Sequence, residues 1–202
     1  MRSLAIAVLC LCLSSSAFAQ TPKPETPMQQ LTDLRLSIRS SRQTAGWVLL
    51  GLGLASVAVG GALAAINHEQ RAHLAAGITT ASFGAVNAAL SFGLMDLSGA
   101  QKSRILAERD PSHFAALREA ELIAHLHSGQ FFAVNAGLDV FYIASGALLC
   151  AIAAVRDQPD RWELGTGIAL MTQGALLMAF DIINWLSSND RSARFRALHS
   201  GG

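Results

Sequence analysis

Charged residues are scarce in this sequence. Only 14% of the 202 residues are Asp, Glu, Lys or Arg, whereas 51% are hydrophobic. Soluble domains carry about 25% charged residues, and a chain this small has too little interior to hide so much apolar surface from water. The composition therefore favours a protein whose solvent is a lipid bilayer. The net charge of +1 offers no basic surface for a nucleic-acid partner.

Cysteine is also sparse, and its positions exclude an internal disulfide. Two of the three cysteines, Cys10 and Cys12, lie in a segment that we expect to be removed. Cys150 is then alone among apolar neighbours, where a cysteine usually acts as a small buried hydrophobe.

The first 19 residues have the pattern of a secretory signal peptide. Arg2 precedes an apolar run over residues 4–13, and Ala17-Phe18-Ala19 forms an A-x-A cleavage site before Gln20. An uncleaved anchor is the alternative. The polar, proline-containing residues that follow are expected to be a linker, which leads into the region 20–43.

Four stretches are long and apolar enough to cross a membrane as helices. They cover residues 44–66, 74–95, 131–155 and 165–188. Short links join the first two and the last two, so each pair should form an antiparallel hairpin. The predicted fold is an all-α integral membrane four-helix bundle, built from transmembrane hairpins at 44–95 and 131–188.

Two amphipathic helices are expected outside the spans. The first covers about 29–43 and either lies in the headgroup region or continues into the first span. The second covers about 111–127 within the loop 96–130, where Asp110 is a cap, Pro111 takes the first position and Gly129 ends the helix. Residues 189–202 are interpreted as a basic flexible tail.

Tryptophan supports the span boundaries. Trp47, Trp162 and Trp185 all fall near predicted span ends, where amphipathic rings prefer the headgroup level. We therefore expect these three residues to be interfacial anchors.

A weak internal repeat relates the two hairpins. Gly77-Ile78 and Gly84-Ala85 recur with the same spacing as Gly167-Ile168 and Gly174-Ala175, and Gly61-Ala62-Leu63 recurs as Gly146-Ala147-Leu148. Repeats of two spans have the same orientation and are related by an axis along the membrane normal. Chance similarity between Gly- and Ala-rich helices is the competing explanation.

A polar cluster is predicted inside the second hairpin and its neighbours. Asp139 and Asp181 lie at similar depths from one membrane surface, and Asn87 and Asn135 fall at a comparable depth. Intramembrane charges are costly and usually face the bundle interior. One interpretation is an ion or proton site whose carboxylates share a proton. The other is a set of hydrogen bonds that hold the helices together.

No cofactor, metal or catalytic site is predicted. His125 and His127 are two residues apart and point to different sides of a helix, so they cannot bind one ion together. The sequence has no phosphate-binding glycine loop and no nucleophile elbow. We expect a non-enzymatic multi-pass membrane protein, a structural or accessory subunit of an envelope membrane complex. Its partners would be the lipid bilayer and other membrane subunits or a second copy. The alternative is a small transporter or channel subunit that uses Asp139 and Asp181 for protons or cations.

The orientation signals conflict. Export by a cleaved signal peptide into a bacterial inner (cytoplasmic) membrane leaves Gln20 outside and both short links in the cytoplasm. Most Lys and Arg residues would then lie outside, against the positive-inside rule. We follow the signal peptide, because it acts first during insertion.

Overall fold

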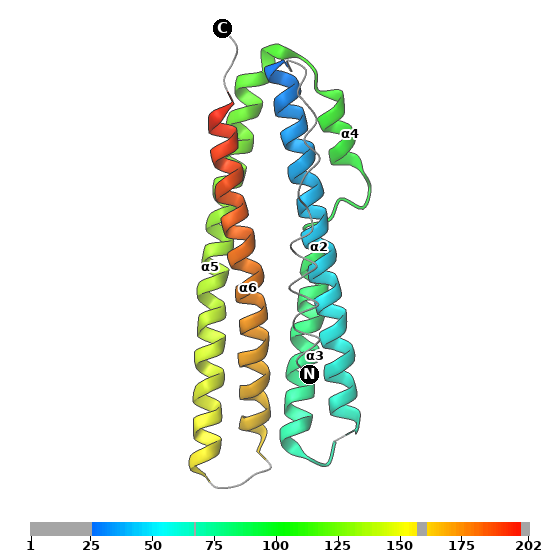
Figure 1. Cartoon of the computed structure of the whole chain (residues 1–202). Coiled ribbons are helices and arrows are strands. Elements are labelled where there is room, and N and C mark those ends of the chain that lie inside the picture. Colours follow the sequence, from blue (N-terminus) through cyan, green and yellow to red (C-terminus); the bar gives the residue numbers. More distant parts are fainter. Residues whose placement is uncertain (1–25, 67, 157–160, 199–202) are drawn as a thin grey trace, which may run out of the picture.

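The computed structural model describes residues 26–66, 68–156 and 161–198, and every regular element in these ranges is helical. Figure 1 shows the elements in order. They are α2 (Pro27–Ile66), α3 (Arg71–Ser91), α4 (Ala100–Ala107), the 3₁₀ turn η1 (Pro111–His113), α5 (Phe114–Val155) and α6 (Trp162–Ala197). The predicted all-α class is confirmed. The predicted signal peptide, residues 1–19, lies outside the described residues.

Helix length divides the molecule into two zones. Among the described residues, α2, α3, α5 and α6 are long and apolar enough to cross a membrane. At 1.5 Å per residue, the 21 residues of α3 extend about 32 Å, close to the roughly 30 Å of a bilayer's hydrocarbon core. The 40 residues of α2 extend about 60 Å. The three longer helices therefore continue far beyond the level at which α3 ends (Figure 1).

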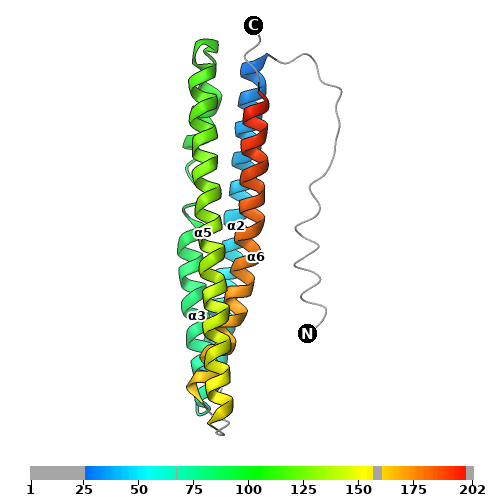
Figure 2. The ribbon, with the colours of Figure 1, turned by 90° about the vertical axis from the view of Figure 1, so that its left-hand side faces the viewer.

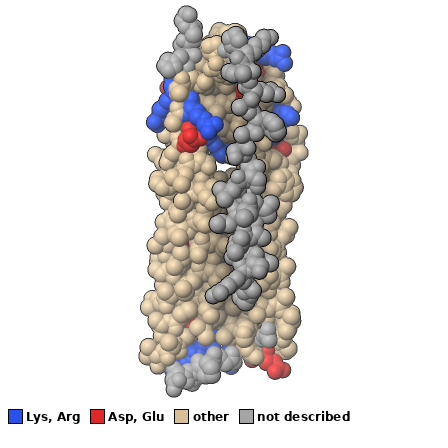
Figure 3. All heavy atoms as spheres, in the orientation of Figure 1, with Lys and Arg blue, Asp and Glu red and all other residues tan. Residues whose placement is uncertain are grey.

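We call the zone that contains α3 the apolar half, and the zone beyond it the crown. The apolar half comprises residues 44–66, 71–95, 131–155 and 162–188, and the crown comprises residues 27–43, 96–130 and 189–197. In Figure 3, charged side chains gather at the two ends of the visible face, with an uncharged band between them. Large apolar side chains of the apolar half are exposed, such as Val59 (63% exposed) and Phe141 (66% exposed). Such a surface requires an apolar solvent, which is consistent with a membrane location.

The crown has the opposite pattern, with apolar side chains inside. Leu31 and Phe195 are fully buried, and Met28, Ile38 and Phe114 complete the same cluster. Phe195 belongs to the last turns of α6, so the prediction of a flexible tail over residues 189–202 is wrong for residues 189–197. The basic composition of this segment suggested a solvent-exposed tail, but burial of the Phe195 ring holds the segment against the crown.

The two amphipathic segments are not separate helices. Residues 29–43 continue into the first apolar stretch within α2, and residues 111–127 continue into the third within η1 and α5. Gly129 does not end a helix, because it lies inside α5 and faces Ser188 of α6. The predicted cap is confirmed: the Asp110 carboxylate accepts a hydrogen bond of 2.9 Å from the backbone N–H of Ser112.

Glycines set how closely the helices approach. α2 lies along α3, α5 lies along α6, and both pairs run antiparallel (Figures 1 and 2). A Cβ atom added to Gly60 would lie 2.5 Å from the carbonyl oxygen of Gly77, and one added to Gly53 would lie 2.7 Å from that of Gly84. Backbones this close leave no space for a side chain, which is the packing that small residues permit between membrane helices.

The same packing recurs in the second hairpin. A Cβ atom on Gly146 would lie 2.6 Å from the carbonyl oxygen of Gly167, just as Gly60 meets Gly77. The equivalent of Gly146 is thus Gly60, and the predicted match to Gly61 is one residue out of register. Gly61 has open space around its Cα and cannot take this role.

Two contacts between the hairpins involve positions that are equivalent in the corrected register. The Phe83 ring on α3 meets the Tyr142 ring on α5 edge to face, with centroids 5.3 Å apart. The equivalents of these residues are Gln173 on α6 and Ser56 on α2, and the Gln173 amide donates a 3.3 Å hydrogen bond to the Ser56 hydroxyl. Two different chemistries thus occupy equivalent positions. The second helices of the two hairpins, α3 and α6, lie side by side.

Candidate functional site

Two of the four predicted cluster residues meet. The carboxyl groups of Asp139 on α5 and Asp181 on α6 are close enough to interact with each other. Both side chains are buried, with 3% and 7% of their surface exposed. The Oδ2 atom of Asp139 is enclosed and has no hydrogen-bond donor among the described residues. The pair is therefore an incompletely satisfied polar site inside the apolar half.

Helix packing explains why these short side chains reach each other. Gly174 on α6 faces the backbone of α5, where an added Cβ would lie 3.0 Å from the carbonyl oxygen of Asp139. In the first hairpin the position equivalent to Asp139 is Gly53, which faces Gly84 in the same manner. The carboxyl pair is thus a feature of the second hairpin alone.

The two asparagines do not complete the predicted cluster. Asn87 is buried on α3 and Asn135 is half-buried on α5. Neither side chain forms a hydrogen bond with another residue in the described part of the chain. The carboxyl pair is consequently smaller than the four-residue cluster that the sequence predicts.

The tryptophans lie at the limits of the apolar half. Trp47 and Trp185 mark its boundary with the crown, and Trp162 opens α6 at the opposite end. All three are exposed on the helix surface, at 54%, 39% and 47% respectively. Their role as interfacial anchors stays a prediction.

The histidine pair faces two ways, as the helical spacing predicts. His125 is buried and stacks on Phe195 with ring centroids 5.4 Å apart, while His127 is exposed. In the described ranges, no group of three or more His, Cys, Asp or Glu residues is placed to hold a metal ion.

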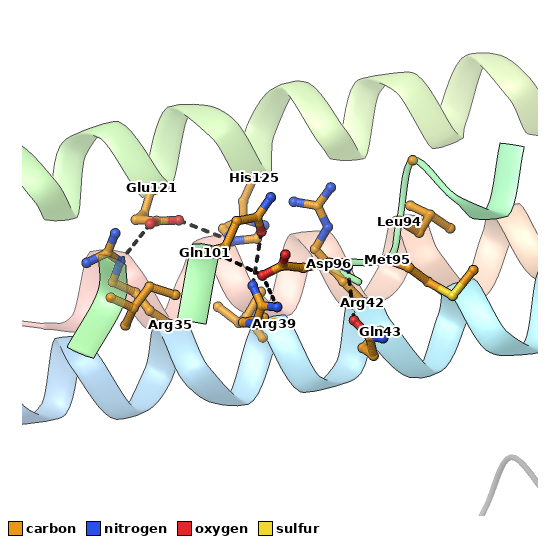
Figure 4. A pocket seen from close by; sticks show the side chains of 13 residues that line it. Arg35, Arg39, Arg42, Gln43, Leu94, Met95, Asp96, Gln101, Glu121 and His125 are labelled. Atoms are coloured by element: carbon orange, nitrogen blue, oxygen red, sulfur yellow. Dashed lines mark hydrogen bonds and ion pairs between the residues drawn. The ribbon is translucent and has the colours of Figure 1, made fainter. Parts of the chain in front are cut away.

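A polar cavity in the crown is a second candidate site. It has a volume of about 100 Å³ and lies between α2, α5 and the segment that links α3 to α4 (Figure 4). Three arginines and two carboxylates line it, together with the His125 ring. The charged residues are Arg35, Arg39, Arg42, Asp96 and Glu121.

Two ion pairs cross the cavity. The Nε atom of Arg35 lies 2.7 Å from Oε1 of Glu121, and Arg39 binds Asp96 and donates a 3.3 Å hydrogen bond to Gln101. The Gln43 side-chain oxygen accepts the backbone N–H of Asp96 at 3.1 Å. These contacts fasten the α3–α4 link onto α2.

The electrostatic environment differs across the cavity. Partial burial acts to raise the pKa of Asp96, but hydrogen bonds from Ser98 and Gln101 and the charge of Arg39 together lower it. Burial lowers the pKa of His125, the charge of Arg191 adds to this effect, and Glu121 opposes it. His125 is therefore neutral at neutral pH, while the carboxylate of Asp96 is ionised.

The sequence does not predict this cavity. Of its titratable lining residues only His125 draws attention, as a possible metal ligand, and Asp96 belongs to the loop expected over residues 96–130. In the corrected register of the repeat, Arg35 is equivalent to Glu121 and Arg39 is equivalent to His125. Equivalent positions of the two halves therefore line the same cavity.

Comparison with known proteins gives a family but no characterised relative. No curated protein and no solved structure matches the chain. One family model covers residues 48–182, which include all four apolar helices in part or in full and exclude the first turns of α2. Because this match covers more than half of the sequence, the chain belongs to DUF6992, a family of unknown function.

Proposed function

We propose that this chain is a non-enzymatic, four-span membrane protein that serves as a structural or accessory subunit of an envelope membrane complex. The observation that carries the proposal is the reversal of side-chain packing along continuous helices. Most of the exposed large apolar side chains lie in the apolar half, whereas the crown holds a buried apolar cluster. Such a chain presents a rigid, water-facing crown above a bilayer, and a crown of this kind is suited to hold another subunit.

The crown surface supports a docking role. Its exposed groups include Lys102 and the partly paired Arg194, whereas the sequence contains no catalytic motif. Charged, partly paired surfaces give association its specificity and rate. The partner would be another membrane subunit or a second copy of this chain.

The orientation follows from the signal peptide that the sequence predicts. We place the crown outside the cytoplasm and the link between α2 and α3 inside, in a bacterial inner membrane. Single cysteines at Ser112 in the crown and Glu69 in that link, in a Cys150→Ser background, test this placement. A membrane-impermeant maleimide added to intact cells should label position 112 and not position 69. Labelling of position 69 and not position 112 would show that the protein has the opposite orientation, with the crown in the cytoplasm.

Photo-crosslinking in native membranes tests the docking role. A photoreactive residue at Lys102 or Arg194 should give a discrete crosslinked species, because these positions are exposed in the crown. The same residue at Val59, which is 63% exposed in the apolar half, is the matched control and should crosslink to lipid. A monomeric protein with no crosslinked partner from any crown position would overturn the proposal.

A second candidate function is a small transporter or channel subunit for protons or cations. The observation that favours it is the buried Asp139–Asp181 pair, in which Oδ2 of Asp139 lacks a donor. Carboxyl groups in hydrocarbon are costly and mark ion or proton paths in many membrane proteins. Replacing both residues with Asn should abolish a proton- or cation-dependent flux in liposomes, whereas the exposed Asp190→Asn control should retain it. Flux that persists in the double variant, or is absent from the unaltered protein, would remove this candidate.

A further inference from the structure

The crown cavity lies where a helix passes from charged to uncharged sequence. Arg42, at the mouth of the cavity, precedes by two residues the charge-free stretch of α2 that begins at Thr44. Trp47 is little more than one turn further along the same helix. In the proposed membrane placement, the mouth of the cavity therefore lies at the level of the lipid headgroups, where arginine side chains are favoured.

The lining of the cavity carries excess positive charge. Glu121 neutralises Arg35 and Asp96 neutralises Arg39. Arg42 has no ion-pair partner in the described ranges, and Figure 4 shows its guanidinium between α2 and α5 with no interaction drawn to it. Arg191, held by a 2.6 Å hydrogen bond to the Ser41 hydroxyl, adds a second positive charge close to His125.

Arg35 also lines the cavity, and part of its guanidinium is unpaired. The Nη1 atom of Arg35 is buried and donates to no acceptor among the described residues, although the Nε atom of the same side chain binds Glu121. A buried guanidinium N–H without an acceptor is costly. Nη1 itself has almost no accessible surface, so an oxyanion in the cavity would act on Arg42, whose charge it would neutralise.

The size of the cavity limits the ligand. Sites for drug-sized molecules occupy about 300–1,000 Å³, and this cavity has about 100 Å³. A tetrahedral oxyanion fits such a volume. Guanidinium groups present several N–H donors in a planar fork, which matches the oxygens of phosphate better than a single ammonium does.

We propose that the crown cavity binds a phosphate group, with the unpaired Arg42 guanidinium at its mouth as the principal donor, and that the position of the mouth favours the headgroup of an anionic phospholipid. The lipid source rests on the proposed membrane placement, whereas binding of phosphate itself does not. Glu121 opposes the anion electrostatically and keeps the empty cavity stable through its pair with Arg35.

Binding by the full-length protein in detergent tests the proposal. The probes are phosphatidic acid, phosphatidylcholine and inorganic phosphate, each titrated separately. Arg42→Gln should weaken binding of phosphatidic acid about tenfold or more, because a charge-assisted hydrogen bond is lost. Glu121→Gln should strengthen it several-fold, because a negative charge leaves the wall while a hydrogen-bond acceptor for Arg35 is retained. Lys102→Gln removes one positive charge from the crown outside the cavity and is the matched control.

The outcomes separate the two sources of phosphate. Preference for phosphatidic acid over phosphatidylcholine, with the opposite effects of the Arg42 and Glu121 variants, identifies a lipid headgroup. The same variant pattern with inorganic phosphate alone identifies free phosphate. Equal effects of Arg42→Gln and Lys102→Gln on every probe would overturn the site, since binding would then follow net charge only. That failure would leave the membrane placement intact, because labelling and crosslinking test it independently.

Discussion

Arg35 and Glu121 occupy equivalent positions in the two halves of the chain and bind each other, with the Arg35 Nε atom 2.7 Å from Oε1 of Glu121. A residue that contacts its own equivalent lies at the junction between the two halves. The ion pair therefore joins the two halves in the crown, and it can form because one half has a positive and the other a negative side chain at this position.

Exchange of these two charges is a first prediction. Glu121→Arg alone places two guanidinium groups together and should destabilise the crown by about 1–2 kcal/mol, a range reduced from that of a fully buried pair because both side chains are partly exposed. The double variant Arg35→Glu/Glu121→Arg should recover about half of this loss or more. Chemical denaturation in detergent measures both values, and a double variant no more stable than Glu121→Arg would show that the pair contributes nothing.

Adjacent glycines on α2 give a second prediction. A Cβ atom on Gly60 would lie 2.5 Å from the backbone of α3, whereas one on Gly61 meets nothing within 4 Å. Gly60→Val should therefore destabilise the α2–α3 pair by about 1–3 kcal/mol, the usual cost of overpacking. Gly61→Val should be close to neutral. Thermal unfolding in detergent distinguishes the two, and equal effects would show that these helices do not pack as described.

The pH dependence of the crown is a third prediction. Burial, aided by Arg191 and Arg42, lowers the pKa of His125 below its ordinary value of 6.5. The unfolded chain then binds more protons than the folded chain as the pH falls through 6.5, so stability is full above that pH and declines below it. His125→Gln should flatten the part of the decline between about pH 7 and pH 5, a range that brackets the unperturbed histidine pKa.

Exposed His127 supplies the control for that experiment. It lies two residues further along α5 and is exposed, so His127→Gln should leave the pH profile of thermal unfolding unchanged. An unaltered profile in His125→Gln would assign the dependence to other groups.

The C-terminal turn of α6 gives a fourth prediction. Phe195 is fully buried in the crown core, so Phe195→Ala should cost about 3–5 kcal/mol. Leu186→Ala, which removes a 55% exposed side chain in the apolar half, should cost far less. Hydrogen exchange of the α2 and α5 amides in the crown measures the effect. Crown protection that is unchanged in Phe195→Ala would show that the last turns of α6 are dispensable.

Much of the helical fold is predictable, because long stretches without charged residues can be recognised directly in the sequence. The four apolar helices and the Asp110 cap follow from local composition and spacing. Continuity through Gly129 did not, because whether a glycine ends a helix depends on what packs against it. Ser188 of α6 lies beside this glycine, far away in the sequence.

The candidate sites were less accessible to sequence reasoning for a similar reason. The prediction that Asp139 and Asp181 lie close together rests on depth alone, since antiparallel neighbours at equal depth lie side by side. Arg39 and Asp96 meet only because the segment after α3 folds back onto α2, and that segment has no helical periodicity to reveal its path. The predicted register of the repeat is wrong by one residue, because the sequence cannot show which of the adjacent glycines Gly60 and Gly61 packs against α3.

α2, α5 and α6 each run from the crown into the apolar half without a break. No hinge therefore separates the two zones along these three helices, and the hydrogen-bonded backbone makes each helix stiff along its whole length. A force applied to the crown is therefore transmitted along the helices to the glycine contacts of the apolar half. A displacement of the crown should appear as a tilt of the helices at the opposite end.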